Sequence, residues 1–208
     1  MKKQLSSLLL ALVLLLSLTP AAGAYDIKTA ASSPIAMSLS HAAYLDDSGA
    51  LWTWGRGASG ELGSGARDNS SVPVKVMDGV ASVSCGGLLS YAMIILKTDG
   101  TVWAWGSNVY GQLGDDNTST TGVSARPVHV KRGEAAADHY FRSNASGYKY
   151  LDHVVKIAAG EHTSMALRSD GSVYVWGRND RNQLGLGNST WGVDAANSQN
   201  NQSVQQSF

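Results

Sequence analysis

The sequence is poor in charge and has no excess of either sign. Asp, Glu, Lys and Arg make up 15% of its 208 residues, against about 25% in a typical soluble domain. The 16 basic and 16 acidic side chains cancel, so the chain lacks the basic excess typical of proteins that bind nucleic acid. Helix surfaces are rich in Glu, Lys and Arg, and the low charge therefore counts against a coiled coil, a helical bundle and a charged disordered chain.

Cysteine is nearly absent as well. Cys85 is the only one, so no disulfide can form within the chain and the fold must depend on packing. Cys85 stands in the segment Val-Ser-Cys-Gly-Gly with no histidine nearby in the sequence to activate it. We expect a small buried hydrophobic residue there rather than a reactive thiol.

No combination of residues indicates a metal site, a cofactor site or an active site. A single cysteine excludes a thiolate zinc site, and the histidines show no metal-ligand spacing. Gly55 to Gly60 matches the G-x-G-x-x-G dinucleotide fingerprint, but the sequence that follows does not indicate a helix, and we interpret it as a loop. We therefore expect no cofactor, no metal and no enzymatic activity. The histidines are His41, His129, His139, His153 and His162.

Only one long apolar run occurs, from Leu8 to Leu18, after Lys2 and Lys3. With the small residues that end at Ala24, it is typical of a secretory signal peptide over residues 1–24. A retained membrane anchor is the alternative, but the run is shorter than the roughly 20 residues of a spanning helix. We predict a secreted or extracytoplasmic protein with no membrane span after signal removal. Loss of the two lysines leaves two more acidic than basic residues.

Glycine is plentiful, and it belongs to a repeated pattern. The 23 glycines exceed the usual share of about 7% and favour a turn-rich, all-β chain. Three segments align without a gap: SGALWTWGRGASGELG (48–63), DGTVWAWGSNVYGQLG (99–114) and DGSVYVWGRNDRNQLG (170–185). Such recurrence indicates a repeated supersecondary unit. The recurring residues, which we expect to be structural, are Trp54, Gly55, Leu62, Gly63, Trp105, Gly106, Leu113, Gly114, Trp176, Gly177, Leu184 and Gly185.

Each copy predicts a small sheet that is covered on both faces. The Asp-Gly or Ser-Gly pair at its start predicts a hairpin turn. The strand that follows alternates aromatic side chains with aliphatic or small ones, so both of its faces are largely apolar. Val72–Val76 and Arg126–Val130 combine a proline with alternating valines, which suits an outer edge strand. Four strands per unit, stacked around an axis, predict propeller blades.

The repeats resemble those of the regulator of chromosome condensation family, in a bacterial-type secreted member or a fragment. The resemblance rests on Asp170-Gly171, Trp176-Gly177 and Gln183-Leu184-Gly185, preceded by the segment 155–163, and it covers about residues 35–190. It implies four-stranded blades of a seven-bladed propeller. In this setting we expect His162 to bond to the backbone of a neighbouring repeat. Ser38 and the one-residue offset of His41 depart from the family pattern.

The chain is too short for such a ring. We assign residues 1–24 to the signal peptide and 25–190 to three repeats, at about 35–79, 80–130 and 154–190, with an insertion at 131–153. Residues 191–208 read as a polar tail without a further strand pattern. An open stack leaves an apolar blade face exposed. We therefore predict an incomplete seven-bladed propeller, either a fragment of a longer protein or one that self-associates.

The insertion at 131–153 mixes aromatic side chains with arginine, the composition of a protein-binding surface. The alternative is a blade-to-blade loop whose aromatics cover the sheet edge, and both remain open. The candidate partner-binding residues are Tyr140, Phe141, Arg142, Tyr148 and Tyr150.

These observations favour an exported, non-enzymatic scaffold for protein–protein interaction, with an unknown protein partner and no nucleic-acid partner. The resemblance also implies an alternative, a guanine-nucleotide exchange factor for a small GTPase. Export counts against it, because such a substrate would be cytosolic. A truncated fragment without independent function is the third interpretation.

Overall fold

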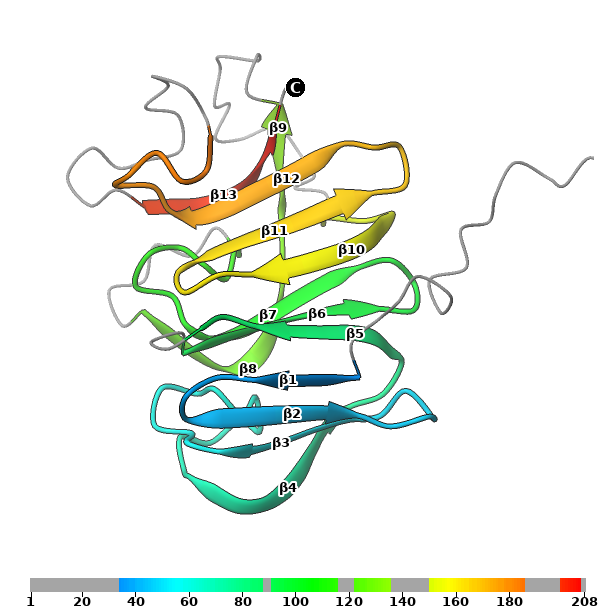
Figure 1. Ribbon diagram of the computed structural model, residues 1–208, viewed down its shortest axis with the longest axis vertical. Helices are drawn as coiled ribbons and strands as arrows, with labels where there is room; N and C mark the ends of the chain where they lie inside the picture. Colours follow the sequence, from blue (N-terminus) through cyan, green and yellow to red (C-terminus); the bar gives the residue numbers. More distant parts are fainter. Residues whose placement is uncertain (1–33, 88–90, 116–121, 136–149, 186–198, 207–208) are drawn as a thin grey trace, which may run out of the picture.

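The computed structural model describes residues 34–87, 91–115, 122–135, 150–185 and 199–206. Within these ranges the chain contains strands and turns and no helix, so the predicted all-β class is confirmed. Three sheets lie one above the other along the long axis of the molecule (Figure 1), and their strands pair antiparallel except for one parallel pair in the third sheet. No helix in this part of the chain is long and apolar enough to cross a membrane.

Each sheet contains one copy of the repeat, and we call the sheets blades 1, 2 and 3. Blade 1 consists of β1 (Ile35–Met37), β2 (His41–Leu45), β3 (Leu51–Gly55) and β4 (Ser70–Met77). Blade 2 consists of β5 (Val80–Cys85), β6 (Ala92–Lys97), β7 (Val102–Ser107) and β8 (Val123–His129). Blade 3 consists of β10 (Val154–Ala159), β11 (Thr163–Arg168), β12 (Val173–Arg178) and β13 (Gln199–Gln206), with β9 (Arg132–Ala135) as a fifth strand.

The hairpins within the blades form where the Asp-Gly and Ser-Gly pairs predicted them. In each hairpin the glycine N–H donates to the carbonyl oxygen three residues earlier, at 3.0 Å from Gly100 to Lys97. Gly100 has a φ of +81°, a conformation that other residues adopt only with strain. The carboxylate of Asp99 also accepts a bond from the N–H of Thr101. The repeat therefore encodes its hairpin turn locally.

The two faces of each blade have opposite roles. In blade 2, Met93, Ile95 and Trp105 pack against blade 1 in one apolar cluster. Ile94 and Leu96, which alternate with them on β6, pack against blade 3 in a second cluster. All five side chains are almost fully buried, so the predicted cover on both faces is confirmed for the middle blade. At both junctions the following blade contributes its Trp face and the preceding blade its aliphatic face.

The outer strands of blades 1 and 2 agree with the proline pattern. Pro73 lies in β4 and Pro127 in β8, and each strand pairs with only one neighbour at the edge of its sheet. A missing backbone donor is tolerated at such an edge because no further strand needs it.

The third repeat contains a strand that was not predicted, and the expectation that residues 191–208 hold no strand was wrong. β13 pairs antiparallel with β12 and is the fourth strand of blade 3. Its Asn- and Gln-rich sequence has no apolar alternation, so nothing local marked it as a strand, and its backbone pairing depends on the edge that β12 offers.

The two ends of the insertion pair and pack with the blades. β9, at its start, pairs parallel with β13 at the outer edge of blade 3. At its end Leu151 is fully buried in the cluster between blades 2 and 3, and its N–H donates to the carbonyl of Val130 at 2.9 Å. The first and last residues of 131–153 are therefore part of the blade framework.

Candidate functional site

The repeated Trp and Leu-Gly residues meet at the junctions between blades. The Trp105 indole of blade 2 donates to the carbonyl of Glu61 in blade 1 at 2.8 Å, and the Trp176 indole of blade 3 donates to that of Gln112 in blade 2 at 2.9 Å. Both indoles are fully buried. The same hydrogen bond therefore joins each pair of neighbouring blades.

Glycine is required where this loop touches the indole. Gly63 and Gly114 have φ angles of +67° and +62°. A Cβ added at Gly63 would lie 2.8 Å from the Trp105 ring, and one at Gly114 would lie 2.9 Å from the Trp176 ring. The structure thus brings together the Leu-Gly pair of one repeat and the Trp of the next. Leu62, Leu113 and Leu184, which precede these glycines and Gly185, are buried.

The glycine after each tryptophan faces backbone in its own blade. A Cβ at Gly106 would lie 2.0 Å from the carbonyl oxygen of Tyr91, and one at Gly177 would lie 2.3 Å from that of His162. At Gly55 the nearest atom, 2.5 Å away, is the carbonyl oxygen of Ser40. At this end of each blade the backbones of the two central strands therefore lie so close together that only glycine fits at this position.

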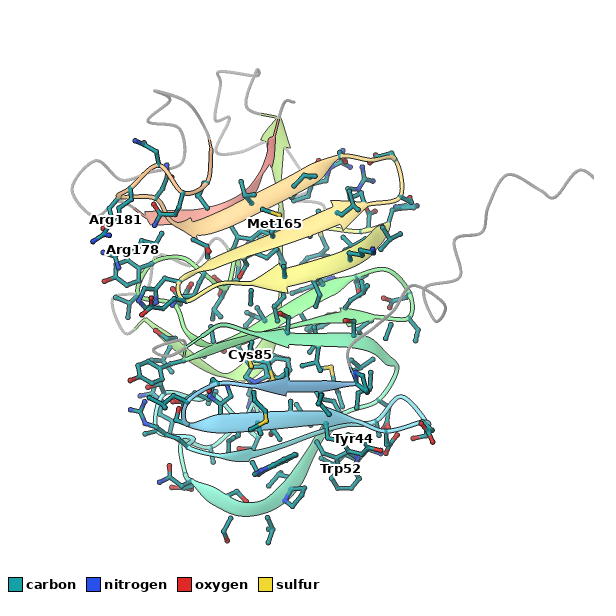
Figure 2. The ribbon with its side chains drawn as sticks, in the orientation of Figure 1. Tyr44, Trp52, Cys85, Met165, Arg178 and Arg181 are labelled. Carbon is teal, nitrogen blue, oxygen red and sulfur yellow. The ribbon has the colours of Figure 1, made fainter. Side chains whose placement is uncertain are left out.

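Arginine and aromatic side chains line this end of the blades. We call this set the loop rim, and it consists of Arg56, Tyr91, Tyr110, His162, Arg178 and Arg181. Arg178 is the last residue of β12, and the other five lie just after β3, β7 or β12, or just before β6 or β11. Figure 2 shows Arg178 and Arg181 at the left edge of the stack, where these loops gather.

Contacts along the loop rim cross the blade junctions. The Arg56 guanidinium of blade 1 lies 4.3 Å from the ring centroid of Tyr91 in blade 2. Tyr110 of blade 2 contacts two groups of blade 3: the His162 ring, at 4.7 Å between centroids, and the Arg178 guanidinium, at 4.8 Å. A cation over an aromatic ring is held by the ring quadrupole and keeps its N–H edges free to donate.

The loop rim has unused hydrogen-bonding capacity. Nδ1 of His162 and Nε of Arg178 are buried and have no hydrogen-bond partner among the described residues. Burial lowers the pKa of His162, although Glu161 beside it acts in the opposite direction. Arg178 is paired with Asp180, whose pKa that bond lowers. At neutral pH the rim therefore presents charged guanidinium groups beside a neutral imidazole.

The expected bond from His162 to a neighbouring repeat's backbone is not among the contacts of the described residues. His162 does touch the neighbouring repeat, but through its ring, which packs on Tyr110. The loop rim was not predicted from the sequence. A signal existed in the Arg that follows Trp-Gly at Arg56 and Arg178, and in the aromatic ring that precedes the second strand at Tyr91 and His162.

Of the five candidate partner-binding residues, only Tyr150 lies within the described ranges. Its ring stacks on His129 at 3.8 Å between centroids, and His129 stacks on Trp103 at 4.4 Å. Trp103 lies at the hairpin end of β7, and the loop rim lies at the other end. Tyr150 covers an edge of blade 2 and is still 49% exposed. The other four candidates, Tyr140, Phe141, Arg142 and Tyr148, lie outside the described residues.

Two other features singled out from the sequence belong to the blades. Cys85 packs beside the cluster between blades 1 and 2 and is partly buried rather than fully buried, and this burial raises its thiol pKa to about 11. Gly55 ends β3, and residues 56–60 form a loop with no helix after it, in agreement with its interpretation as a blade loop. No group of His, Cys, Asp or Glu in the described ranges could hold a metal ion.

Two models of the regulator of chromosome condensation (RCC1) repeat match the chain. One matches residues 80–112 and 154–183, and the other matches 48–93, 99–167 and 170–204. The longer match extends into β13.

Curated relatives match about three quarters of the chain. It is 34% identical over 157 residues to the E3 ubiquitin-protein ligase HERC2 of Homo sapiens, which covers 74% of this chain and 3% of that protein. It is 30% identical to the ultraviolet-B receptor UVR8 of Arabidopsis thaliana and 36% identical to the mitochondrial RCC1 domain-containing protein RUG3 of the same plant. These matches cover 74% of this chain and 31% and 32% of the two plant proteins. The chain thus spans a third or less of the length of these relatives.

Solved structures share the fold. Human WBSCR16 aligns with a TM-score of 0.52 and 26% identity over 70% of this chain and 33% of that one. Prp20p from Saccharomyces cerevisiae, whose crystal structure was described with its binding properties to Gsp1p and histones, aligns with a TM-score of 0.59. The identity to Prp20p is 22%, over 83% of this chain and 38% of that one.

Proposed function

The chain belongs to the regulator of chromosome condensation (RCC1) repeat family, and from this premise we propose that it is an exported, non-enzymatic scaffold that binds another protein through its loop rim. The observation that carries the proposal is the row of arginines stacked on aromatic rings across both blade junctions. Prp20p, which shares the fold, binds proteins.

The chemistry of the loop rim fits a protein partner. Arginine and tyrosine are the side chains most often found at the centres of binding interfaces, because they combine apolar area with directed hydrogen bonds. Arg56 is partly exposed, and Arg181 is exposed at the tip of the blade 3 loop. The partner surface should therefore present carboxylate or carbonyl oxygens to the guanidinium edges.

The insertion is the second part of the proposal. Residues 136–149 stand in the sequence between β9 and Tyr150, and Tyr150 lies at the hairpin end of blade 2, away from the loop rim. We include the insertion as a separate contact, with Tyr150 at its described edge.

Export and the larger assembly also belong to the proposal. The apolar run before Ala24 supports secretion through a signal peptide. The exposed side chains at the end of blade 1, Met37 at 73% and Tyr44 at 42%, support further blades beyond the three, as a propeller needs to close.

The test is partner capture with matched arginine variants. Immobilised chain is incubated with the medium and the surface fraction of its host, and captured proteins are identified by mass. We expect Arg56→Ala and Arg181→Ala to lose the capture of one specific protein. Arg56→Lys should capture a reduced amount of it, because an ammonium group neither stacks on a ring nor donates two parallel hydrogen bonds as a guanidinium group does. Lys75→Ala is the control, since Lys75 is an exposed cation on β4 that pairs with Asp78.

A second variant examines the insertion without disturbing the framework. It replaces 136–149 by a short Gly-Ser linker and keeps β9 and the buried Leu151. Capture that is unchanged in the arginine variants would refute the loop-rim proposal, and capture unchanged in the linker variant would remove the insertion from it.

A further inference from the structure

We propose that Glu61 positions Arg56 in the loop rim, so that the free edge of the Arg56 guanidinium receives a carboxylate of the protein partner. The inference rests on the proposed function and deepens it, because it names the residue that prepares the contact and the chemical group that the contact selects. All of the residues that form this arrangement lie in blades 1 and 2, at a junction that is complete within this chain.

The side chain of Glu61 has one task that all three repeats share. Gln112 and Gln183 occupy the same position in the other two copies. In each copy one side-chain oxygen accepts a hydrogen bond from the backbone N–H two residues earlier. The three bonds measure 2.7 Å from Ser59, 2.8 Å from Tyr110 and 2.8 Å from Arg181. Because an amide oxygen closes the loop as a carboxylate does, this task does not require the negative charge of Glu61.

The second oxygen of Glu61 makes a contact that the matching atom of blade 2 lacks. Oε1 of Glu61 is buried, forms no hydrogen bond with the described residues and lies 3.3 Å from Nη1 of Arg56. A buried carboxylate is strongly disfavoured unless a cation compensates its charge. The corresponding atom of blade 2, Nε2 of Gln112, has no partner in the described ranges, and Ser107 stands in the place of Arg56. The acid of blade 1 is therefore matched to the arginine of its own loop.

Arg56 is held from two directions. Its Nη1 faces Glu61, and its guanidinium carbon lies 4.3 Å from the ring centroid of Tyr91 in blade 2. Within the described ranges Nε and Nη2 make no hydrogen bond, and the Arg56 side chain is 37% exposed. These two nitrogens form the edge of a guanidinium group that binds a carboxylate through two parallel hydrogen bonds. A side chain that is already fixed loses less entropy on binding, so the two supports raise the affinity of this edge.

The imidazole beside Arg56 adds no second cation. His41 is 3% exposed, and its Nδ1 lies 2.8 Å from the hydroxyl oxygen of Ser38. Burial and the charge of Arg56 lower the pKa of His41 to about 4, so this ring is neutral at neutral pH. Arg56 is thus the group that compensates the charge of Glu61.

Blade 3 holds its rim arginine in a different way. Arg178 pairs with Asp180, which also accepts a hydrogen bond from Nε2 of Gln183 at 3.2 Å. The Asp180 side chain is 30% exposed, so an incoming carboxylate competes with it for the same guanidinium. Glu61 is 0% exposed and cannot be displaced from solvent. The geometry therefore assigns the partner's carboxylate to Arg56 rather than to Arg178.

The substitution Glu61→Gln separates the charge from the loop bond. Its amide oxygen can accept from Ser59 as that of Gln112 accepts from Tyr110. We expect the denaturation midpoint of the full chain to stay the same or rise, because no buried charge then has to be desolvated. The main-chain carbonyl of residue 61, which accepts from the Trp105 indole, is not removed, so tryptophan fluorescence confirms that the junction is folded.

Nuclear magnetic resonance of the Arg56 side chain measures its position. The Tyr91 ring shifts the resonances of protons that lie over it, and Tyr91→Leu supplies the reference without the ring. We expect Glu61→Gln to move the Hδ and Hε resonances of Arg56 toward that reference. Asp180→Asn is the matched control, since it removes the exposed rim carboxylate by the same kind of change and should leave Arg56 unaltered. Unaltered Arg56 resonances in Glu61→Gln would overturn the proposal.

Partner capture measures the consequence for binding. The probe is the medium and the surface fraction of the host, used before and after its carboxyl groups are converted into amides. The unmodified chain should capture one specific protein only before this conversion. Glu61→Gln should bind that protein about two- to tenfold more weakly, which is the cost of ordering one side chain, and Asp180→Asn should bind it at least as tightly as the unmodified chain. Capture that either the conversion or Glu61→Gln leaves unchanged contradicts the proposal.

Two results separate this inference from the proposed function. If Arg56→Ala loses capture while Glu61→Gln keeps it in full, the loop rim binds its partner without help from Glu61 and only the inference is wrong. If Arg56→Ala also keeps capture in full, the partner does not contact this arginine and the proposed function of the loop rim is wrong as well.

Discussion

Replacing Gly114 by alanine would place a methyl group 2.9 Å from the buried indole of Trp176. Real Cβ contacts are not that short, so the indole or the loop must move and the bond from the indole to Gln112 must lengthen. Alanine at a φ of +62° also adopts a left-handed conformation, which costs about 1–2 kcal/mol. A buried donor that loses its acceptor costs about 1–3 kcal/mol more. We expect Gly114→Ala to lower the free energy of unfolding by about 2–5 kcal/mol.

Substitutions at two other glycines separate the backbone cost from the cost of disturbing the indole. Gly171 has a φ of +86°, and no atom lies within 4 Å of the position that a Cβ would take there, so Gly171→Ala should carry the backbone cost alone, about 1–2 kcal/mol. Gly87 has open space and no positive φ, so Gly87→Ala should be neutral or stabilising by about 0.4–1 kcal/mol. Chemical denaturation followed by tryptophan fluorescence and circular dichroism measures all three. If Gly114→Ala is no more destabilising than Gly171→Ala, the junction does not depend on the glycine–indole contact.

Three further outcomes follow from the structure. Burial and nearby Arg56 lower the pKa of His41 from 6.5 to about 4; the unfolded chain therefore takes up a proton that the folded chain excludes, and the free energy of unfolding should fall by up to about 3 kcal/mol between pH 6.5 and 4. His41→Gln should flatten that part of the pH profile, and an unchanged slope would contradict the assignment. Cys85, which is partly buried and has its pKa raised to about 11, should react with a thiol reagent at pH 8 more slowly in the folded chain than in the unfolded chain, and equal labelling rates would contradict its packing beside the cluster. Nucleotide release from a panel of small GTPases should not accelerate when the chain is added, and acceleration would favour the exchange-factor alternative instead.

The repeat pattern predicted the blades because its information is local. Alternating side chains around an Asp-Gly or Ser-Gly turn specify a hairpin within about ten residues, and the same pattern three times specifies three hairpins. The proline-bearing strands β4 and β8 were predicted for the same reason. β13 was not, because its Asn- and Gln-rich residues carry no alternation and its pairing depends on the free edge of β12.

The loop rim could not be found by the same route. Arg56 and Tyr91 are far apart in the sequence, and they meet only because blade 2 stacks on blade 1 with its loops at the same end. Tyr110, His162 and Arg178 likewise come from two blades. Tyr150 was identified from composition, yet only the fold shows that His129 lies between its ring and Trp103.

The sequence by itself determined the all-β class, the hairpins, the family and the residues that recur, since each of these follows from short-range spacing and from the conformations that glycine alone tolerates. Tertiary structure decided the direction of the stack, the carbonyl that accepts from each junction indole, the fourth strand of blade 3 and the packing of arginines on aromatic rings in the loop rim. These depend on which face of one blade meets which face of the next, and that choice is made by packing between segments that lie far apart in the sequence.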